Sequence, residues 1–535
     1  MLRIFTSVVL LLSILVASAV AQKPLTVTFI HNNDVHGRVE PTTINNREYG
    51  GVSRTQTLIR EVRNSATNPI LLSAGDVFQG TLYFNVYEGL GDLAFMNLAG
   101  FQAMAVGNHE FDRGPEAFAR FIEHATFPVL ACNLDLSEEP ALRDLIKPYV
   151  ILEVEGQKIG IIGAVVENLR EVTTLGPNIK ELPVIDSVRE QVKALQAQGV
   201  NKIVLLSHCG FSDEMRYAQE IPELDVVIGG HSHTLLGEFE DPNIPEPRGS
   251  YPMVVEHPGG KKTLVVQAWQ WGKILGVLEV EFDAEGNPVK WSENSMLVVD
   301  DKIEKDPTAE SIVAALAKPI EELRATVIGS TDTGLGGDRT LIRLAENTMG
   351  NVIADAMLES GQKAGAQIAF MNSGGIRAII PPGEITYDEA ITVQPFGNTM
   401  VVLELTGDEI RQALEHAVSR VSEGGGGFLQ VSRGFQYTFD ATKPVGERVV
   451  SFTLNDKPLA PNQVYRVVLN NFTANGGDGF RVFAESKGTR IDTGDLDLDV
   501  LIEYIKANSP VNRKPEGRIT RVDQPSPANP SFSLR

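Results

Sequence analysis

Residues 107–112 read GNHEFD, and the apolar run FQAMAV leads into them at residues 101–106. An apolar run of this length that ends in polar residues is typical of a buried strand followed by a turn. The turn carries three side chains that could bind a metal or take part in catalysis, which are Asn108, His109 and Asp112. The sequence thus predicts that a strand delivers these polar groups to one corner of an α/β domain.

Four further apolar runs end in polar residues of the same kind. The runs are LTVTFI at 25–30, NPILLSA at 68–74, NKIVLLS at 201–207 and LDVVIGG at 224–230. The side chains that follow them are Asp34 and His36 in NNDVHG, Asp76 in GDVFQG, His208 in SHCG, and His231 and His233 in GGHSH. Each motif alone is explained by ordinary turn chemistry. Because ligand sites in α/β sheets lie beyond the carboxyl ends of the strands, the five together predict one metal site.

The side chains of this predicted site favour particular ions. Carboxylate, imidazole and amide oxygen ligands without a thiolate suit Zn, Mn, Co or Fe. The seven candidates, Asn108 included, are too many for one tetrahedral ion, whereas two ions roughly 3.5–4 Å apart would use them all. Such a pair is the usual clamp for in-line attack on phosphorus. The remaining candidates by residue type are expected to pack or to form supporting hydrogen bonds, and they are Glu110, His31, His124, His257 and His416.

The domain organisation is predicted from a change in the pattern of apolar, amphipathic and glycine-rich stretches along the chain. Up to about residue 300, apolar runs alternate with amphipathic stretches such as GGVSRTQTLIREVRN at 50–64, which is typical of a layered α/β domain. The stretch DPTAESIVAALAKPIEELRAT at 306–326 predicts a helix, and the glycine-rich GSTDTGLGGD follows it at 329–338. We therefore expect a first domain at 22–305, a linker helix and hinge at 306–337, and a second α/β domain at 338–522.

The two ends of the chain carry no part of these domains. Residues 1–21 combine an early Arg3, an apolar run and a small-residue pattern at Ala19 to Ala21, which is typical of a secretory signal peptide. We therefore expect an exported protein, periplasmic or extracellular. Residues 523–535 are a polar Pro/Ser tail, expected to be disordered, without the hydrophobic extension of a lipid-anchor signal. No later stretch approaches the roughly 18 apolar residues of a spanning helix, so no membrane anchor is expected.

Composition narrows the range of partners. The chain holds 47 Lys and Arg against 69 Asp and Glu, a formal net charge of −22. This charge argues against nucleic-acid polymers and anionic membranes as partners. Two cysteines, Cys132 and Cys209, are too few to frame a domain of this size, and either a pair or two buried thiols would suit them. The oligomeric state leaves no sign in the sequence.

Taken in order, NDVHG, GDVFQG, GNHEFD, SHCG and GGHSH resemble the motifs of the calcineurin-like metallophosphoesterases. Together with MNSGGIR, PFGN and NFTANGGDGF, they make residues from about 25 to about 520 resemble the 5'-nucleotidase family. That family holds bacterial periplasmic UDP-sugar hydrolases and animal ecto-5'-nucleotidase. The resemblance implies a four-layer αββα metallophosphoesterase domain and a separate α/β C-terminal domain joined by a helical linker.

The resemblance also assigns the ligands. It implies one divalent ion held by Asp34, His36 and His233, a second held by Asn108, His208 and His231, and Asp76 shared by both. Family members vary at the position of His233, where glutamine or asparagine also occurs. His109 is then not a ligand but faces the substrate phosphate, with Asp112 bonded to its other ring nitrogen. An imidazolium held in this way stabilises developing charge and protonates the leaving group, while water is the nucleophile.

The C-terminal half carries the residues that the resemblance assigns to the substrate. Arginine forks bind phosphate, and aromatic rings in polar loops stack on a nucleobase. The assigned residues are Arg339, Arg343 and Arg377 for phosphate, Phe396 and Phe472 for the base, and Asn372, Asn398 and Asp478 for base and ribose. From spacing alone, Arg339 and Arg343 are better explained as a solvated helical face. The two phenylalanines are explained equally well as lids over a core edge.

The resulting hypothesis is an exported two-metal 5'-nucleotidase that hydrolyses nucleoside 5'-phosphates, with UDP-sugars and nucleoside di- and triphosphates as further substrates. One alternative is a 2',3'-cyclic phosphodiesterase with 3'-nucleotidase activity, or a sulfur-oxidation hydrolase of the same superfamily. A second alternative, from another class, is a non-catalytic nucleotide-binding protein. The complete ligand set together with His109 and Asp112 counts against that last alternative.

Overall fold

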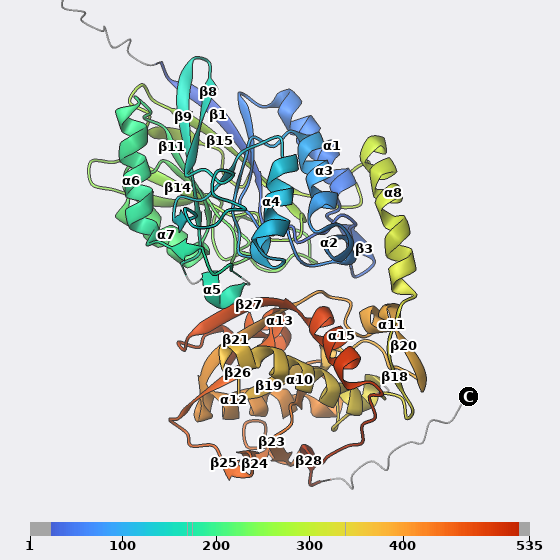
Figure 1. Ribbon diagram of the computed structural model, residues 1–535. Helices are drawn as coiled ribbons and strands as arrows, with labels where there is room; N and C mark the ends of the chain where they lie inside the picture. The colour runs from blue at the N-terminus through green and yellow to red at the C-terminus, as the bar shows by residue number, and fades with distance from the viewer. Residues whose placement is uncertain (1–22, 168, 174, 337–338, 524–535) are drawn as a thin grey trace, which may run out of the picture.

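The computed structural model describes residues 23–523 apart from 168, 174, 337 and 338, and it shows two α/β domains connected by one long helix (Figure 1). The predicted signal peptide and nearly all of the predicted tail lie outside the described residues. Among the helices within that range, none combines the length and the apolar character needed to cross a bilayer.

Two mixed sheets form the centre of the first domain. The first sheet has the order β16-β15-β1-β4-β5-β6, with β17 paired to β15. Its strands are β1 (Leu25–Asn32), β4 (Pro69–Ser73), β5 (Ala103–Ala105), β6 (Val129–Leu130), β15 (Ile274–Phe282), β16 (Pro288–Trp291) and β17 (Leu297–Val298). The second sheet has the order β13-β14-β12-β11-β9-β8. Its strands are β8 (Tyr149–Val154), β9 (Gln157–Val165), β11 (Ile203–His208), β12 (Val226–Ile228), β13 (Met253–Glu256) and β14 (Lys262–Val266).

Alternation of side chains along these strands produces the layers. In β1, Phe29 lies in the core between the two sheets, and its neighbour Ile30 lies in the core beneath the outer helices. In β4, Leu72 lies in the core between the sheets and Leu71 in the core beneath the outer helices, as the two-residue repeat of a strand requires. Helices α1 (Val52–Ser65), α2 (Leu82–Tyr87), α3 (Leu90–Ala99) and α4 (Pro115–His124) supply the first outer layer, and α6 (Val184–Ala197) and α7 (Phe211–Glu220) the second. The domain is the expected four-layer αββα arrangement.

Parallel pairing brings the carboxyl ends of the inner strands to one edge. Strands β1, β4, β5 and β6 run parallel in one sheet, and β9, β11, β12 and β14 run parallel in the other. Cys132 and Cys209 are both buried in the core of this domain, and both are free thiols. Small ribbons and a short helix lie outside the two sheets: β2 (Thr42–Ile44) with β3 (Arg47–Tyr49), β7 (Leu134–Asp135) with β10 (Lys180–Glu181), and α5 (Leu169–Val172).

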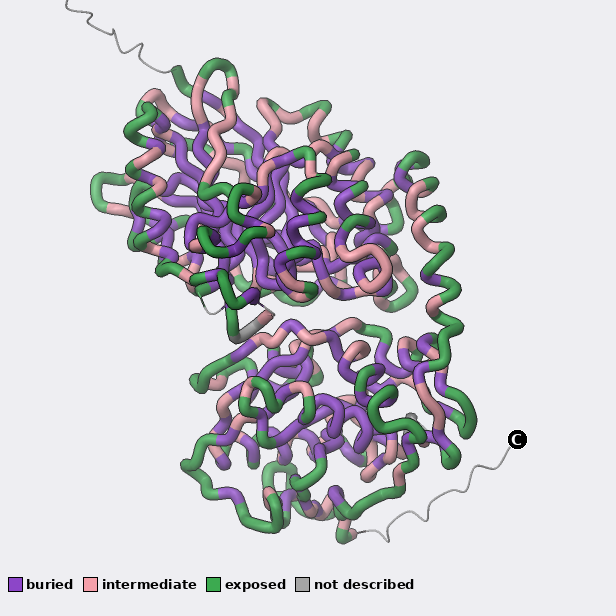
Figure 2. The backbone as a smooth tube through the Cα atoms, viewed as in Figure 1, coloured by how far each residue is buried: buried purple, intermediate pink, exposed green. Residues whose placement is uncertain are grey.

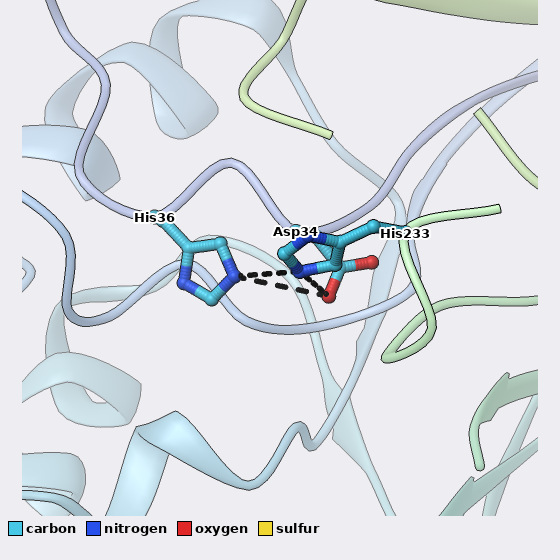
Figure 3. Close-up of side chains that lie close together, drawn as sticks. All are labelled: Asp34, His36 and His233. Atoms are coloured by element: carbon cyan, nitrogen blue, oxygen red, sulfur yellow. Dashed lines mark hydrogen bonds and ion pairs between the residues drawn. The ribbon is translucent and has the colours of Figure 1, made fainter. Parts of the chain in front are cut away.

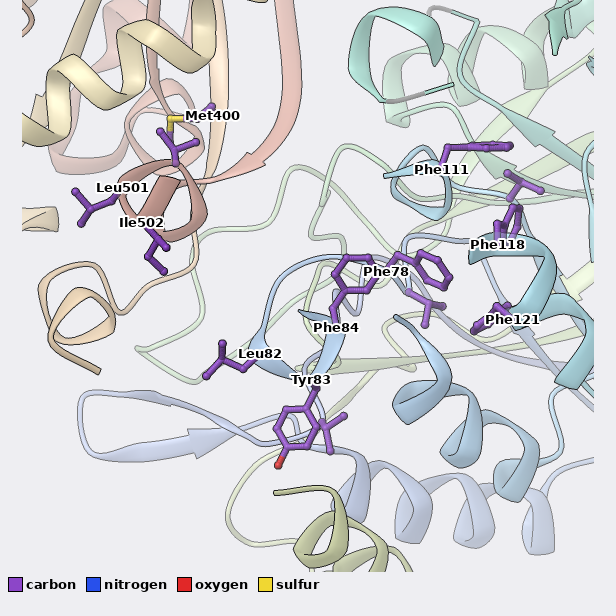
Figure 4. Packing of buried hydrophobic residues seen from close by; sticks show 14 of the residues in the cluster. Phe78, Leu82, Tyr83, Phe84, Phe111, Phe118, Phe121, Met400, Leu501 and Ile502 are labelled. Atoms are coloured by element: carbon purple, nitrogen blue, oxygen red, sulfur yellow. The ribbon is translucent and has the colours of Figure 1, made fainter. Parts of the chain in front are cut away.

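Buried phenyl rings anchor the loops at this edge (Figure 4). Phe78, two residues after Asp76, packs against Phe84 and Phe121 with ring centroids 5.2 and 5.3 Å away. Phe111, within GNHEFD, packs edge-on against Phe118 at 5.4 Å. Each buried phenyl ring contributes roughly 1.5–3 kcal/mol, so these rings fix the loops that carry Asp76 and Asn108.

The second domain is built on a five-stranded sheet in the order β22-β19-β26-β21-β27. Helices pack on both faces, and a four-stranded sheet, β25-β24-β23-β28, adds to one side. The strands of the two sheets are β19 (Ile368–Asn372), β21 (Thr399–Thr406), β22 (Leu429–Val431), β23 (Phe435–Phe439), β24 (Val449–Leu454), β25 (Lys457–Pro458), β26 (Val464–Asn470), β27 (Arg490–Leu496) and β28 (Ile519–Arg521). The helices are α9 (Arg339–Ile342), α10 (Thr348–Gly361), α11 (Tyr387–Val393), α12 (Gly407–Ser419), α13 (Asn471–Ala474), α14 (Arg481–Ala484) and α15 (Asp497–Asn508).

The linker helix α8 (Pro307–Arg324) runs along one side of the molecule between the domains (Figure 1). Asp306 caps it, because its Oδ1 accepts the backbone N–H groups of Thr308 and Ala309 at 2.9 and 3.0 Å. Most of the helix surface is exposed or half-buried (Figure 2). The glycine-rich segment that follows begins inside strand β18 (Val327–Thr331), which pairs with β20 (Gly383–Thr386) in the second domain.

Candidate active site

The candidate ligands lie together at the shared carboxyl edge of the two sheets. Loops after β1, β4 and β5 of the first sheet meet the end of β11 and the loop after β12 of the second. Five of the seven candidates are at most 4% exposed, and the side chain of His233 is 15% exposed. Residues that span 200 positions of sequence therefore form one largely buried cluster.

The first group of ligand atoms belongs to Asp34, His36 and His233 (Figure 3). The Nε2 atoms of the two imidazoles lie 3.1 Å apart, and Nε2 of His233 lies 3.2 Å from Oδ1 of Asp34. Ligands at 2.0–2.1 Å from one tetrahedral ion lie about 3.3 Å apart, so these separations match the edges of a coordination sphere. The donor set and its spacing fit a divalent ion.

The second group belongs to Asp76, Asn108, His208 and His231. Oδ2 of Asp76 lies 3.0 Å from Nε2 of His208, and Oδ1 of Asn108 lies 2.9 Å from Nδ1 of His231. The same Asp76 oxygen lies 3.9 Å from Nε2 of His36 in the first group. Oδ2 of Asp76 thus approaches an imidazole of each group and comes closest to His208, while Oδ1 of Asp34 lies 3.9 Å from Nε2 of both His36 and His208.

Backbone carbonyls orient two of the imidazoles. Nδ1 of His36 donates to the carbonyl of Phe78 at 3.2 Å, and Nδ1 of His208 donates to the carbonyl of Ala74 at 2.6 Å. A hydrogen bond of this kind fixes the ring orientation and leaves Nε2 with a lone pair for a metal. Burial lowers the pKa of His36 to about 3, which keeps that ring neutral and able to bind. For Asp76, burial acts to raise the pKa, but the imidazoles of His208 and His109 outweigh it and hold the pKa well below its usual range.

The ligand loops hold an unusual backbone conformation. Five of the seven candidate ligands have positive φ angles of 49–70°, and they are Asp34, His36, Asp76, His231 and His233. The left-handed region costs roughly 1–2 kcal/mol for each non-glycine residue. Hydrogen bonds offset part of this cost, since the Asp34 carboxylate accepts the backbone N–H of His231 at 3.0 Å. Such a concentration of strained residues is characteristic of functional sites.

Glu110 supports the site without facing it. Its carboxylate accepts the backbone N–H groups of Gly107 at 2.7 Å, Val77 at 2.8 Å and Asp76 at 3.1 Å. These bonds tie the two ligand loops to each other. A Cβ at position 107 would lie 2.3 Å from Oδ1 of Asp76, so only glycine allows this close approach.

His109 is held at the border of the metal groups. Its Nδ1 lies 2.6 Å from Oδ2 of Asp112, whose other oxygen accepts the hydroxyl of Thr173 at 2.8 Å. Nε2 of His109 lies 4.0 Å from Oδ2 of Asp76. Burial acts to lower the pKa of His109, but the carboxylates of Asp112 and Asp76 outweigh it and raise the pKa to about 10. The ring is therefore held in one position beside the candidate metal site.

In the second domain, the candidate base-binding rings are exposed. Phe396 is 41% and Phe472 is 47% exposed, and the guanidinium of Arg377 lies 5.4 Å from the centre of the Phe396 ring. Asn372 is buried at the end of β19, and its amide donates to Oδ2 of Asp478 at 2.8 Å. The two rings are thus open to solvent or to a ligand, whereas Asn372 is held by another of the candidates.

The remaining substrate candidates are placed differently. Asn398 is buried, and its Nδ2 donates to Asp497 at 3.1 Å. Nη1 of Arg343 donates to the carbonyl of Gly424 at 3.0 Å. The side chain of Arg339 lies outside the described part of the structure.

The domains meet directly over the catalytic edge. A Cβ added to Gly494 of β27 would lie 2.0 Å from Cε1 of His109, so this glycine packs against the imidazole. Nη2 of Arg38 donates to the carbonyl of Phe396 at 3.4 Å, and Asn85 donates to the hydroxyl of Tyr387 at 3.1 Å. A cleft of about 1110 Å³ lies beside these contacts, and residues of both domains line it, among them Asp112, Arg113, Arg170, Asp495 and Asp499.

Sequence patterns did not identify several side chains that hold the site. Asn33 donates to Oδ2 of Asp34 at 2.6 Å, and Thr173 holds Asp112. Gln267 accepts the backbone N–H of Thr234 at 2.9 Å and donates to Glu214 at 2.6 Å, next to the His231 loop. Asn33 stands beside a candidate ligand, which is the one available sequence signal. The others lie far from any motif.

The fold and the paired ligand groups define a metal-dependent phosphoesterase. Two family models match the chain: calcineurin-like phosphoesterase over residues 27–235 and 5'-nucleotidase, C-terminal domain, over residues 327–485. A 5'-nucleotidase from Diplobatis ommata is 36% identical over 96% of this chain and 93% of its own length. The chain therefore belongs to the 5'-nucleotidase family of metal-dependent phosphoesterases.

Two further comparisons agree with this membership. The crystal structure of a 5'-nucleotidase precursor from Thermus thermophilus is 44% identical, covers 94% of this chain and 100% of its own, and superposes with a TM-score of 0.62. A trifunctional nucleotide phosphoesterase protein of Bacillus subtilis is 36% identical over 93% of this chain. This chain spans only 35% of the length of that relative.

Proposed function

We propose that the chain is an exported two-metal 5'-nucleotidase that hydrolyses nucleoside 5'-monophosphates to nucleoside and phosphate. The observation that carries the proposal is the position of Asp76 between two groups of ligand atoms, 3.0 Å from His208 and 3.9 Å from His36. We propose Asp34, His36 and His233 for one divalent ion, Asn108, His208 and His231 for the other, and Asp76 for both. Zn, Mn, Co or Fe suits these oxygen and nitrogen donors.

The bound ions would supply an activated water and positive charge for the phosphoryl oxygens. The residues of the chain supply the rest. The His109 imidazolium stabilises charge on the phosphoryl group and carries the proton for the departing 5'-oxygen. Asp112, itself held by Thr173, keeps the ring in position. Burial of this edge excludes bulk water other than the reacting one.

Recognition of the nucleoside is assigned to the second domain. Phe396 and Phe472 stack on the base, Asn372 and Asp478 bind base and ribose together with Asn398, and Arg339, Arg343 and Arg377 bind phosphate. The exposure of both rings supports this assignment, because a base that covers them would bury apolar surface on binding. The segment 306–337 acts as the hinge that brings the nucleoside to the metals, since Gly494 now covers His109.

The same proposal includes domain limits at 22–305 and 338–522 and export through residues 1–21. It also includes a broader substrate range, with UDP-sugars and nucleoside di- and triphosphates. The apolar run before Ala19 supports export, and the match of the 5'-nucleotidase C-terminal domain model to residues 327–485 supports a separate second domain. The full-length precursor expressed with its first 21 residues is expected to be cleaved and exported, whereas a chain that starts at Lys23 stays in the cytoplasm.

A substrate panel tests the activity. Purified enzyme with added Mn, Co or Zn is assayed for phosphate or nucleoside release from AMP, UDP-glucose, 3'-AMP and 2',3'-cyclic AMP. We expect AMP to give the highest kcat/KM, and a chelator to abolish all turnover until metal is restored. Preference for 3'-AMP or the cyclic nucleotide would replace the proposal by the phosphodiesterase alternative. Full activity of verified metal-free protein would remove its basis.

A further inference from the structure

His233 depends on a side chain for its orientation. Its Nδ1 lies 2.6 Å from Oε1 of Gln270, while its Nε2 faces Asp34 at 3.2 Å and His36 at 3.1 Å. An amide oxygen only accepts hydrogen bonds, so the proton must sit on Nδ1 of His233. That tautomer leaves the lone pair on Nε2, the atom that faces the first ligand group. Backbone carbonyls orient the imidazoles of His36 and His208 in the same way, and a side-chain substitution does not remove a backbone carbonyl.

Gln270 lies in a turn between β14 and β15 that is bonded to both ligand loops. The backbone N–H of Trp271 donates to the carbonyl of Asp34 at 2.7 Å, and Asn33 donates to the carbonyl of Trp269 at 2.7 Å. On the other side, the backbone N–H of Trp269 donates to the carbonyl of Thr234, next to His233, at 3.2 Å. The turn therefore fixes the position of Gln270 relative to Asp34 and His233 at once.

The same turn holds a strained conformation on both sides of Gln270. Trp269 and Trp271 have φ angles of 58° and 61°, in the left-handed region that bulky residues rarely occupy. The ammonium of Lys273 lies 4.5 Å from one indole centre and 4.1 Å from the other, and the guanidinium of Arg38 lies 4.4 Å from Trp271. Two cations on the indole faces hold this conformation. Strain that the surroundings maintain so firmly points to a function for the residue between the two indoles.

We propose that Gln270 is a positioning residue for the first metal ion, acting through the ring orientation and tautomer of His233. The inference rests on the proposed two-metal site. Gln270 itself touches neither metal nor substrate. The second group, with Asn108, His208 and His231, is oriented without it. Loss of Gln270 should therefore weaken one metal site and leave the other unchanged, which a general packing defect would not do.

The test compares metal affinity in three variants and the wild type. Gln270→Met removes the acceptor at similar volume, and Gln270→Glu keeps an acceptor oxygen in the same place. Gln56→Met is the matched control, because Gln56 also makes one hydrogen bond, 2.7 Å to the carbonyl of Phe95, but lies in α1. Metal-free proteins are titrated with Zn in competition with a chromophoric chelator. The visible absorption of the Co-loaded proteins reports on ligand geometry.

We expect wild type and Gln56→Met to bind two Zn ions alike. Gln270→Met should bind one ion about 10- to 100-fold more weakly, the usual effect of losing a partner behind a metal-bound histidine, with an altered Co spectrum. Gln270→Glu should restore the affinity. If Gln270→Met keeps both affinities within two-fold, or loses both equally, the positioning role is wrong while the proposed function stands. If the wild type binds no Zn, both proposals fail.

Discussion

The candidate metal edge of the first domain and the loops of the second that are proposed to bind the nucleoside are built in different ways. At the metal edge, His208 and Asp34 are completely buried, and five candidate ligands have a left-handed backbone. In the second domain, Phe396 and Phe472 leave 41% and 47% of their surface exposed. The difference indicates that the chemical groups are fixed before substrate arrives, whereas recognition is completed by the substrate itself. Losses at the metal edge should therefore appear in kcat and losses in the loops in KM.

The largest effect is expected from Asp76, which is proposed to bind both ions. Asp76→Asn should lower kcat for AMP by about 10³-fold or more and reduce bound metal, because the amide loses the charge that both ions share. Phosphate release and elemental analysis measure the two quantities. Asp213→Asn, which alters an exposed carboxylate paired with Arg216, is the control. An Asp76→Asn enzyme with two ions and near-normal turnover would contradict the shared-ligand role.

Substitution of His109 should give the next largest loss of kcat. It also distinguishes a catalytic role of this residue from a metal-binding one. Its Nε2 lies 4.0 Å from Asp76, close enough for either role by distance alone. If it acts on the transition state, His109→Ala should lower kcat by roughly 10²-fold, the range for loss of a general acid. Metal stoichiometry, measured on the same sample, should stay at the wild-type value. A variant that loses an ion would show that His109 is a ligand.

Substitution of the two phenylalanines tests the loops of the second domain. Base stacking contributes roughly 1–3 kcal/mol per ring, so Phe396→Ala with Phe472→Ala should raise KM for AMP by about ten-fold to several hundred-fold. The base lies far from the reacting bond, so kcat should change little. Ribose 5-phosphate, which lacks a base, serves as the matched substrate and should be hydrolysed alike by both enzymes. Equal losses for both substrates would assign the rings to the fold or the hinge.

The smallest change in activity is expected at Asn398, which is proposed to bind the nucleoside and is also bonded to Asp497. Its amide donates to the buried carboxylate of Asp497, so Asn398→Ala should cost about 1–3 kcal/mol of stability. Thermal unfolding should show a Tm several degrees lower, and KM for AMP should rise by roughly 2- to 10-fold, the loss of one neutral hydrogen bond to the nucleoside. Asn508→Ala, in the same domain and at the exposed end of α15, is the control. A KM that stays at the wild-type value would remove Asn398 from the proposed substrate site.

Strand-end residues are the part of the site that sequence could predict. Apolar runs mark buried strands, parallel strands end at one edge, and Asp34, Asp76 and His208 follow such runs directly. The same runs predict a layered α/β domain, and the family resemblance implies its αββα arrangement. No sequence pattern predicts the left-handed backbone of the candidate ligands, because loop conformation depends on contacts between distant segments. For the same reason the bond between Asn398 and Asp497, 99 positions apart, had no local pattern.

Long-range contacts also explain what pattern reasoning missed around the linker and the ligands. The glycine-rich segment after the linker helix is predicted as a linker or hinge from its composition, and the strand formed by Gly329 to Thr331 within it depends on the pairing partner that β20 supplies. Gln270 lies 37 positions from His233 in a turn of ordinary composition. The contact between Gly494 and His109 joins two domains. Each of these features depends on tertiary packing, which overrides local propensity.

The turn around Gln270 gives the protein an optical property. The chain has only three tryptophans, and two of them, Trp269 and Trp271, flank the residue that holds His233. The third, Trp291, lies in β16 with the ammonium of Lys262 5.2 Å above its ring. Indole emission from this enzyme should therefore come largely from the neighbourhood of one metal ion. Coloured Co ions should quench it and colourless Zn ions should not, so filling of that site can be followed by fluorescence without any label.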